Sequence, residues 1–456
     1  MCNGFDSLHA RANIELGQKV MRQTDRLALF PKGASVNGAG HLMVGGCDTV
    51  DLASIYETPL YVFDEDTVRA KAAEFKSEFG RRYPDVTILY ACKAFINKSL
   101  LKLVREAGVG LDVVSGGEIE IARSFGFPMD LVSFPGNNKS EKELNLALDV
   151  GVGRIVVDNF DELRMLGALV QSRRLKQAVL LRVTPGVDPH THRYEATGTL
   201  DSKFGFPLRH GERALSAALS IPYLNVLGLH FHVGSQLEDT EAHEQAISIV
   251  LEFAGRMARQ QGFTARELSV GGGYPVQHTL DSPVPEVGTF AEAVTRTVTT
   301  KCRTFGLPLP HLVVEPGRSL VAQAGVALYT VGAMKEVPGV RTYVSVDGGM
   351  ADNIRPALYQ SRMEAVIANR MNEGSDGVYT VAGKFCESGD ILINDIPLPL
   401  PRSGDLLATP GCGAYNIPQS CNYNAFPRPA VVMTRGGEAR LIRRRETIED
   451  LMACDV

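Results

Sequence analysis

A short β-rich run, followed by a turn and then a helical stretch, recurs eight times between about residue 61 and residue 325. Strands that alternate with helices imply parallel βαβ units, and eight such units can close on themselves into a (β/α)₈ TIM barrel. A doubly wound open sheet is the alternative that the same pattern allows. The eight runs are VTILYACK (86–93), GLDVVSGGE (110–118), LVSFPGN (131–137), RIVVDN (154–159), VLLRVTPG (179–186), VLGLHFHVGS (226–235), LSVGGGY (268–274) and LVVEPGRS (312–319).

The pattern changes after about residue 326, where short β-like runs are separated by turns. Such runs are typical of a mostly antiparallel β domain. Residues 34–48 contain an Asn-Gly pair and predict a hairpin that joins this sheet from the other end of the chain. The predicted domains are an N-terminal segment with the hairpin (1–60), a barrel (61–325) and a C-terminal β domain (326–456), with no element assigned to the first 25 or so residues. The runs are VALYTVGAM, RTYVSVDGG, GVYTVAG, DILINDIPLP, AVVMTRGG and ARLIRR.

The length and charge of the chain limit its partners. Its 456 residues exceed the usual size of one hydrophobic core, so two domains are the default expectation. The formal net charge is −5, and Lys and Arg are scattered rather than clustered. This composition provides no electrostatic footprint for nucleic acid or anionic lipid. The expected partners are small molecules and another copy of the chain.

The sequence shows no sign of a targeting segment or of a membrane helix. The first residues, MCNGFDSLHARANIELGQ, mix charges early and lack the apolar core of a signal peptide. No stretch reaches the roughly 18 uninterrupted apolar residues of a membrane helix, so we expect a soluble, cytoplasmic protein. The eight cysteines include no CxxC pair, which argues against a disulfide framework and a zinc site, and no metal is expected.

Polar residues or glycines follow each of the eight predicted barrel strands. In a barrel the active site lies at the carboxyl ends of the strands, because the βα loops converge there. Turn-forming Gly, Asn and Asp would also stand at these ends in a purely structural barrel, so no single position is decisive. Their presence at all eight ends indicates a site. The residues are Lys93, Asp112, Asn137, Asp158, Arg182, His232 with Ser235, Gly271 to Gly273, and Glu315 with Arg318.

Lys93 ends an apolar, β-branched run that otherwise has the composition of core. A lysine there is a solvated amine, a salt-bridge partner or an amine that forms a Schiff base. The glycines Gly271 to Gly273 let backbone N–H groups approach an anion at the usual phosphate site of this fold, where a flexible turn is the alternative. Glu315 and Arg318 add an acid and a cation on the next strand. A Schiff-base lysine, a phosphate cradle and a buried acid together suggest pyridoxal 5′-phosphate.

Three side chains have specific roles in such a site. Pyridoxal chemistry needs a protonated ring nitrogen, and Glu315 is the candidate carboxylate that keeps the proton there. A salt bridge or a helix entry before the Pro-Gly turn would also explain this acid. His232 can stack on the ring, with a hydrogen-bonded core histidine as the alternative. Ser235 can reach the phosphate, with an ordinary turn serine as the alternative.

Ten motifs, in order along the chain, resemble those of the fold-type III pyridoxal-phosphate decarboxylases, which are related to alanine racemase and ornithine decarboxylase. Among these enzymes, the motifs are most similar to those that act on diaminopimelate. The resemblance extends from about residue 28 to residue 430 and implies the barrel with its β domain, bound pyridoxal 5′-phosphate and a homodimer. The motifs are YACKA, DVVSGGE, TPGVDPHTH, DSKFGF, LHFHVGSQ, GGGY, EPGRS, DGGMADNIRPALY, CESGD and GAY.

The resemblance also assigns roles to residues. It matches Lys93 to the Schiff-base lysine, His232 to the residue stacked on the ring and Glu315 to the partner of the ring nitrogen. Phosphate and cofactor binders are matched by Ser235, Gly271, Gly272, Gly273, Gly317, Arg318 and Tyr415. The residues that hold the far end of the substrate are matched by Arg318, Arg355, Tyr359, Glu387 and Tyr415.

In this family the second subunit of a head-to-tail dimer inserts two residues into the first subunit's site, and Cys386 and Glu387 match them. The cysteine then acts as the proton donor to the product, whereas a small buried hydrophobe is the alternative for Cys386. Arg355 suits a distal carboxylate and Glu387 suits a distal ammonium. A surface arginine before Pro356 is the alternative for Arg355. An enzyme for ornithine or lysine would have an acid in its place.

The function that the resemblance implies is decarboxylation of meso-2,6-diaminopimelate to L-lysine and carbon dioxide, the last step of lysine biosynthesis. The alternatives are a decarboxylase of a related diamine-pathway or siderophore intermediate and a non-catalytic homologue that binds the cofactor. In alanine racemases an arginine usually faces the ring nitrogen, so Glu315 favours decarboxylation over racemisation. Phe95 and Pro135 depart from the family's usual asparagine and histidine, and both are expected to line the mouth.

Overall fold

The computed structural model describes residues 22–188, 198 and 201–456, and the chain forms two compact units. The barrel unit comprises Thr67–Val276 and Pro283–Ala322. The β unit comprises the described part of Met1–Asp66, together with Gln277–Ser282 and Gln323–Val456. The boundary expected at residue 61 falls inside strand β4 (Leu60–Asp64), because this wholly buried run pairs with strands of the β unit.

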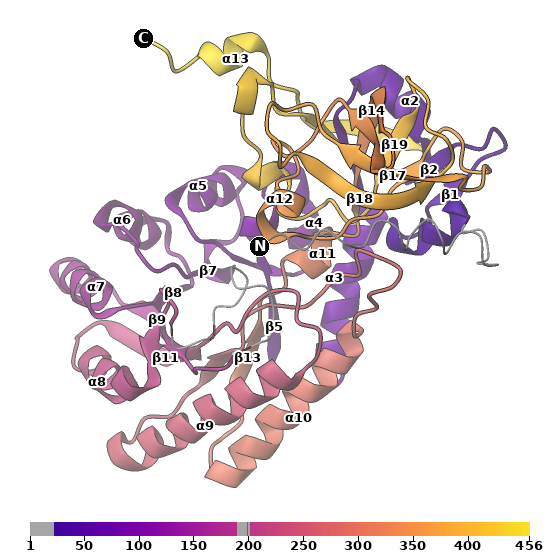
Figure 1. Cartoon of the computed structure of the whole chain (residues 1–456). Coiled ribbons are helices and arrows are strands. Elements are labelled where there is room, and N and C mark those ends of the chain that lie inside the picture. The colour runs from indigo at the N-terminus through magenta and orange to yellow at the C-terminus, as the bar shows by residue number, and fades with distance from the viewer. Residues whose placement is uncertain (1–21, 189–197, 199–200) are drawn as a thin grey trace. The chain divides into compact units, whose positions relative to one another are not determined.

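Eight parallel strands form the barrel unit, one for each of the eight runs in the sequence (Figure 1). These strands are β5 (Val86–Ala91), β6 (Gly110–Asp112), β7 (Val132–Phe134), β8 (Arg154–Val157), β9 (Gln177–Thr184), β11 (Leu224–His230), β12 (Glu267–Ser269) and β13 (His311–Val314). The ring closes because β13 pairs with β5 and β8 pairs with β9. This closure confirms the predicted barrel and excludes the open sheet. A short strand, β10 (Phe206–Pro207), pairs with β9.

Helices follow the strands and lie outside them (Figure 1). They are α3 (Glu65–Gly80), α4 (Lys98–Glu106), α5 (Gly116–Phe125), α6 (Glu141–Val150), α7 (Phe160–Arg173), α8 (Leu208–Leu219), α9 (Glu241–Gln261) and α10 (Val287–Phe305). The connecting segments contain the short helix α11 (Arg318–Val321) and the 3₁₀ turns η2 (Cys92–Ala94) and η3 (Met129–Leu131). Among the described residues, no helix is both long and apolar enough to cross a membrane.

Several of the turn residues seen in the sequence are helix N-caps in the structure. The side chain of Asn97 accepts a hydrogen bond from the N–H of Leu100, and Ser115, Ser140 and Asn159 cap α5, α6 and α7 in the same way. These caps satisfy N–H groups that have no partner within the first turn of a helix. Each cap therefore fixes where its helix begins, and the residues before it form the βα loops at the mouth of the barrel.

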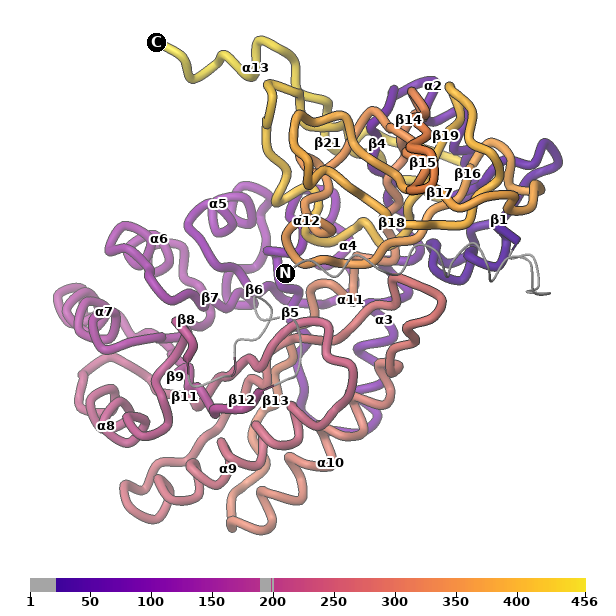
Figure 2. The backbone as a smooth tube through the Cα atoms, viewed as in Figure 1, coloured from indigo at the N-terminus to yellow at the C-terminus, as the bar shows by residue number. Residues whose placement is uncertain are grey.

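The β unit contains a nine-stranded sheet that is mostly antiparallel, as the sequence predicted. Its strands are β4, β14 (Gly325–Val337), β15 (Arg341–Val346), β16 (Val366–Ile367), β17 (Gly377–Ala382), β18 (Ile391–Leu398), β19 (Leu406–Thr409), β20 (Ala430–Arg435) and β21 (Glu438–Arg443). Two pairs are parallel, β15 with β17 and β20 with β4. Strand β4 lies between β14 and β20, so a segment from the start of the chain joins two from its end (Figure 2).

The predicted N-terminal hairpin is present, but its strands pair only with each other and with a third short strand. The sheet consists of β1 (Ser35–Val36), β2 (Leu42–Val44) and β3 (Cys47–Asp48) and is followed by helix α2 (Thr49–Tyr56). Leu42 and Val44 pack in the same core as Val62 and Val326. The N–H of Leu42 also donates to the carbonyl of Ala368 at 2.8 Å. Shared core and single backbone hydrogen bonds, rather than extended strand pairing, therefore hold the hairpin in place.

The remaining elements of the β unit are short. They are η1 (Gln23–Leu29), α12 (Arg355–Tyr359), η4 (Ile417–Gln419), η5 (Tyr423–Ala425) and α13 (Ile448–Met452). The last four residues of the motif TPGVDPHTH, 189–192, lie outside the described residues.

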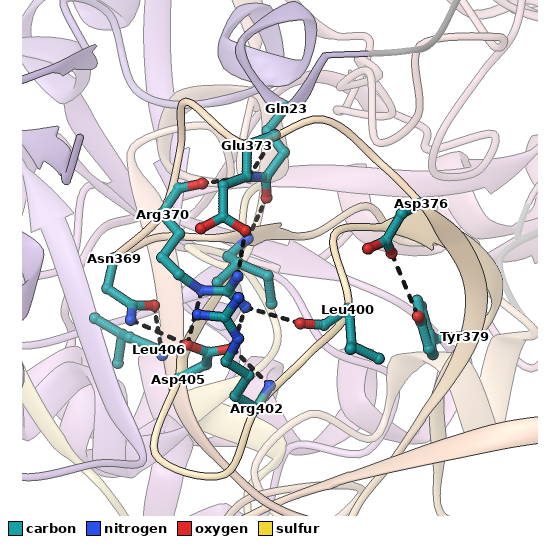
Figure 3. A network of polar contacts seen from close by, with 11 residues as sticks. Gln23, Asn369, Arg370, Glu373, Asp376, Tyr379, Leu400, Arg402, Asp405 and Leu406 are labelled. Atoms are coloured by element: carbon teal, nitrogen blue, oxygen red, sulfur yellow. Dashed lines mark hydrogen bonds and ion pairs between the residues drawn. The ribbon is translucent and has the colours of Figure 1, made fainter. Parts of the chain in front are cut away.

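A polar network ties the start of the described chain to the loops of the β unit (Figure 3). Gln23 donates to the carbonyls of Arg370 and Glu373, and its own amide oxygen accepts from the N–H of Ile367 at 2.6 Å. The guanidinium of Arg370 donates through Nε to Asp405 Oδ1 at 3.0 Å. Four donors converge on Asp405, because Asn369 and the N–H of Arg402 bind it as well. We call this group the Arg370 network.

Candidate active site

Lys93 lies in the turn η2, two residues after the last residue of β5, and its side chain is exposed. Burial has the largest effect on the pKa of four groups near the barrel end: it favours a higher pKa for the acids Asp112, Glu118 and Glu315 and a lower one for His232. The positive charge of Lys93 acts to lower the pKa of all four. A rigid strand therefore brings the amine to the end of the barrel, where its charge acts on three acids and an imidazole of neighbouring βα segments.

The glycine triplet after β12 has a backbone that side chains would obstruct. Gly271 and Gly273 have φ angles of +71° and +104°, a region that favours glycine. A Cβ on Gly272 would lie 2.3 Å from the carbonyl oxygen of Glu315, and one on Gly271 would lie 2.6 Å from that of Phe231. The triplet is thus held tightly between β11 and β13, which argues against a merely flexible turn.

His232 is fixed against this triplet. Its Nδ1 accepts a hydrogen bond from the N–H of Gly272 at 3.1 Å, so the proton of the neutral ring is on Nε2. Burial, together with the charges of Lys93 and Arg182, lowers the pKa of His232 well below its ordinary value. The ring is therefore a neutral, flat surface with one defined tautomer, which suits stacking on an aromatic ligand.

Glu315 follows β13 and is buried, with 5% of its surface exposed. Ser269 Oγ donates to its Oε1 at 2.7 Å, and His230 Nε2 lies 3.1 Å from its Oε2. Burial opposes ionisation, yet His230 and Ser269 hold the pKa of Glu315 below its ordinary value. This carboxylate is therefore charged in the interior of the barrel, where a protonated ring nitrogen would find an acceptor.

Asp112 ends β6 and is also buried, but its electrostatic state is the opposite. Burial, and then the charge of Glu315, raises the pKa of Asp112 well above its ordinary value. Its Oδ1 has no hydrogen-bond partner among the described residues. Buried polar atoms are nearly always paired in folded proteins, so this oxygen indicates a position where a ligand or water would bind.

Ser235 and Arg318 contact each other. Arg318 Nη2 donates to Ser235 Oγ at 2.9 Å, and the arginine is buried at the start of α11. Gly317, just before it, leaves room for Ala91, because a Cβ there would lie 3.1 Å from the Ala91 side chain. The arginine thus orients the serine hydroxyl, and this contact distinguishes Ser235 from a serine that only forms a turn.

Two buried ion pairs support the opposite side of the mouth. Lys139 Nζ donates to Glu162 Oε1 at 2.7 Å and also to two backbone carbonyls. Arg182 Nε lies 4.0 Å from Asp158 Oδ1, and its guanidinium stacks over Phe204. Asn137, in the loop after β7, accepts from the side chain of Asn159 through its carbonyl. These contacts join neighbouring βα loops.

The described residues of the barrel unit fit pyridoxal phosphate. The cofactor has an aldehyde, a phosphate and a ring nitrogen, so its site must provide an amine, a set of N–H donors and a carboxylate. Lys93 provides the amine and Glu315 a charged carboxylate, while Gly271 to Gly273 form a cradle that any Cβ would fill. His232 adds a neutral ring of fixed orientation.

Arg355 and Tyr359, predicted to hold the distal end of the substrate, lie together on α12 of the β unit. Arg355 is buried, with 3% of its surface exposed, so the alternative of a surface arginine is wrong. Its guanidinium lies 5.3 Å from the centre of the Tyr359 ring, and its Nη2 donates to Ser361 Oγ at 3.2 Å. The helix thus presents a cation stacked on an aromatic ring.

Cys386 and Glu387 lie on an exposed loop of the β unit, so the alternative of a buried cysteine is wrong. The loop is held at its base by Asp390, whose carboxylate accepts from the N–H groups of Phe385 at 2.9 Å and Met350 at 2.7 Å. A further hydrogen bond from the N–H of Cys386 to Asn424 Oδ1, at 2.8 Å, fixes the loop. The cysteine is therefore exposed on a well-anchored turn.

Tyr415 is half-buried and has a φ of +62°, which is uncommon for a residue other than glycine. Such strained positions cluster at functional sites, so the geometry is consistent with the role expected for it. Phe95 and Pro135, the two departures, are both buried, and the carbonyl of Phe95 accepts from the hydroxyl of Tyr90 at 2.6 Å.

The predicted site residues divide between the two units. The barrel unit brings together Lys93, His232, Ser235, Gly271, Gly272, Gly273, Glu315, Gly317 and Arg318, and the β unit carries Arg355, Tyr359, Cys386, Glu387 and Tyr415.

The sequence reasoning missed His230 and Ser269. Side chains alternate along a strand, so His230 points to the same side of β11 as His232, and Ser269 to the same side as Gly271. That spacing of two was visible in LHFHVGS and LSVGGG and could have identified both residues.

Residues 65–322 match the family model described as "Pyridoxal-dependent decarboxylase, pyridoxal binding domain". Two curated relatives are the diaminopimelate decarboxylases of Bacillus subtilis and Halalkalibacterium halodurans. The first is 46% identical over 431 residues and the second 44% over 432, and each alignment covers 94% of this chain and 98% of the relative.

A solved structure also resembles the chain over most of its length. It is the diaminopimelate decarboxylase of M. jannaschii in complex with L-lysine, which superposes with a TM-score of 0.87 at 32% identity. The match covers 93% of this chain and 98% of the other.

Proposed function

This chain belongs to the diaminopimelate decarboxylases, and from that membership we propose that it converts meso-2,6-diaminopimelate to L-lysine and carbon dioxide. The observation that carries the proposal is the charged, buried carboxylate of Glu315 in the same barrel mouth as the Lys93 amine and the Gly271 to Gly273 cradle. Bound pyridoxal phosphate supplies an electron sink for the electron pair left at Cα when the carboxylate departs.

The residues of the barrel unit have distinct tasks in this proposal. Lys93 would hold pyridoxal phosphate through its amine. Glu315 accepts the hydrogen bond that keeps a proton on the ring nitrogen, and His232 packs its neutral ring against the cofactor. The N–H groups of the glycine triplet, with Ser235 as held by Arg318, bind phosphate oxygens.

Residues of the β unit select the substrate and return a proton. Diaminopimelate carries an amino-acid head at each end, so its distal end offers a carboxylate and an ammonium. Arg355 pairs with the carboxylate through its planar guanidinium, which lies over the ring of Tyr359. Glu387 pairs with the ammonium. Cys386 gives a proton to Cα after carbon dioxide has left, which completes the amino acid.

We further propose that Cys386 and Glu387 reach the site of the partner in a cytoplasmic homodimer. Their exposure on an anchored loop supports this arrangement, because a residue that serves another subunit must stand clear of its own fold. A symmetric dimer contains two equivalent sites, each completed by the other subunit.

Mixing inactive Lys93→Ala and Cys386→Ala proteins tests the shared site. Random exchange makes about half of the dimers mixed, and each mixed dimer keeps one of its two sites intact, so about a quarter of wild-type activity should return. Tagged subunits that can be purified as a mixed dimer provide the control for exchange. A purified mixed dimer without activity would contradict the shared site.

The activity itself is tested with purified protein loaded with pyridoxal phosphate. We expect one carbon dioxide and one L-lysine for each meso-diaminopimelate consumed, and little release from L-lysine or L-ornithine, which lack the carboxylate that Arg355 is proposed to bind. Faster decarboxylation of either of these two amino acids would support the related-substrate alternative. No carbon dioxide from any of them, with lysine-bound cofactor present, would support a non-catalytic homologue.

A further inference from the structure

Two side chains without an assigned role bind the carboxylate of Glu315. His230, which is 1% exposed, lies 3.1 Å from Oε2, and Ser269, which is fully buried, donates to Oε1 at 2.7 Å. We propose that His230 and Ser269 are positioning residues that orient the Glu315 carboxylate toward the pyridine nitrogen of the cofactor. The proposal rests on the proposed function only in that the barrel binds pyridoxal phosphate.

Strand pairing places the three residues in line across the barrel. The strands β11, β12 and β13 are neighbours (Figure 2), with His230 in register with Ser269 and Ser269 in register with Val313. Glu315 lies two residues beyond Val313 along the same chain direction, and its N–H bonds to the carbonyl of Gly271 at 2.9 Å. The carboxylate is thus held by rigid elements, as an accurately placed site requires.

Each carboxylate oxygen receives one donor and keeps a lone pair for another. A charged carboxylate only accepts hydrogen bonds, so His230 must carry its proton on Nε2 and donate it. Its Nδ1 has no partner among the described residues, so the bond to the acid is the contact that fixes the orientation of the ring. Two donors at fixed positions leave the carboxylate little freedom to rotate, and the remaining lone pairs define where a third donor can bind.

The charges that face Glu315 show why these donors are needed. Besides His230, the charge of Glu315 interacts with Asp112, Lys93, Arg182 and Tyr274, and burial raises the pKa of Asp112 so that it does not compete as a second charge. Burial also opposes the charge of Glu315, whereas His230 and Ser269 favour it. Without them Glu315 would take up a proton more readily, and a neutral carboxyl would not provide the negative charge that keeps a proton on the ring nitrogen.

Ser269 connects this carboxylate to the phosphate cradle. Its Oγ donates to Glu315 and also accepts from the N–H of Gly271, at 3.4 Å. One hydroxyl therefore bonds both to the loop expected to bind the phosphate and to the acid expected to bind the ring. This arrangement fits a ligand whose two ends must be bound at a fixed distance from each other. A residue that only stabilised the barrel would not need to contact both groups.

Cofactor affinity distinguishes a positioning role of His230 and Ser269 from a purely structural role. The probes are pyridoxal 5′-phosphate and deazapyridoxal 5′-phosphate, in which a carbon replaces the ring nitrogen, and the dissociation constant of each from the apoprotein is measured by absorption titration. Wild type should prefer the nitrogen-containing cofactor by about 10- to 100-fold, the usual effect of one hydrogen bond to a charged group. No preference in wild type would overturn the proposal.

The variants test the role of each donor. His230→Leu should lose most of that preference, while His230→Gln, which keeps an N–H donor near Nε2, should retain it, and Ser269→Ala should lose part of it. His243→Leu is the matched control, because His243 is an equally buried imidazole of the barrel unit whose ring stacks on Tyr274, and the preference of this variant should be unchanged.

Three results would contradict the positioning role of His230 and Ser269. A folded His230→Leu protein with the full wild-type preference would overturn it, as would an equal loss in the His243→Leu control. If His230→Leu does not fold, Ser269→Ala decides, and an unchanged preference there overturns the proposal. Because the readout is binding of two cofactors, failure of the diaminopimelate assay would not affect it.

Discussion

Asp405 in the β unit and Asp112 in the barrel unit are both buried carboxylates, but only Asp405 is fully paired. Four donors converge on Asp405, with Arg370 among them (Figure 3), and although burial opposes its charge, these donors hold the pKa of Asp405 below its ordinary value. Asp112 has an oxygen without a partner in the described chain, and burial with the charge of Glu315 raises its pKa.

This difference distinguishes residues that stabilise the fold from residues that are placed to bind a ligand. Pairing a buried charge stabilises the folded chain, whereas a buried carboxyl that lacks a partner costs stability until something binds it. The Arg370 network therefore stabilises the fold, whereas Asp112 is placed to serve the chemistry of the mouth. Changes in the mouth should impair function with little loss of stability, and changes in the Arg370 network should do the reverse.

Lys93→Ala should have the largest effect of the mouth variants. Loss of the anchoring amine should lower kcat/KM by at least about 10³-fold and remove the visible absorption of lysine-bound cofactor. The urea midpoint should stay near that of the wild type, because the side chain is exposed. Lys93→Arg serves as the control for charge and should be equally inactive. A variant that retains the visible band would show that another amine anchors the cofactor.

Asp405→Asn should have the largest effect on stability. It removes the buried carboxylate from the mostly buried guanidinium of Arg370, which keeps only the more exposed Glu373 as an ion-pair partner, and this should lower the free energy of unfolding by about 3 kcal/mol. Urea unfolding followed by circular dichroism measures this loss. Asp281→Asn, which breaks an exposed pair with Arg362, is the matched control and should cost less than about 1 kcal/mol. Equal losses in the two variants would contradict a structural role for the network.

The pH dependence of the two acids should have opposite signs. In the folded barrel Asp112 keeps its proton at a pH where the unfolded chain has lost it, so its unfavourable effect on stability grows as pH rises above about 4. Asp405 has a lowered pKa, so its favourable effect is present above about pH 4 and is lost as pH falls through the folded value.

Asp112→Asn should therefore have the smallest effect on stability near pH 4. Since the amide resembles the protonated carboxyl, the variant should be within about 1 kcal/mol of wild type near pH 4 and gain on it at higher pH. Unfolding in urea between pH 4 and pH 8 measures the trend. A variant that loses stability relative to wild type as pH rises would mean that Asp112 is charged in the fold.

Much of the fold could be predicted because its signals are local. The eight runs became the eight barrel strands, and turn residues such as Asn97 and Ser140 became helix caps. The short strands β16 and β19 were missed, whereas equally short barrel strands such as β7 were found because the strand–turn–helix pattern around them recurs along the chain. The place of β4 was also missed, since its partners β14 and β20 are more than 250 residues away along the chain.

Site residues could be predicted where residue type and position within a motif indicate the chemistry. They could not be predicted where their role depends on how neighbouring strands are aligned. Lys93, the glycine triplet and Glu315 stood out by residue type and position. His230 and Ser269 gain their meaning only when β11, β12 and β13 are aligned, because their partner lies 85 and 46 residues away. The charge states of Asp112 and Glu315 depend on each other and on burial, which no local pattern records.

The division of roles between the two regions is tested most directly by one paired measurement on Glu315→Gln and Asp405→Asn. For each, the free energy of unfolding of the apoprotein and its dissociation constant for pyridoxal 5′-phosphate are determined in the same buffer. We predict that Glu315→Gln weakens cofactor binding by about 10-fold or more with a small change in stability, and that Asp405→Asn does the opposite. If both variants lose stability and affinity to the same extent, the two regions do not differ as proposed.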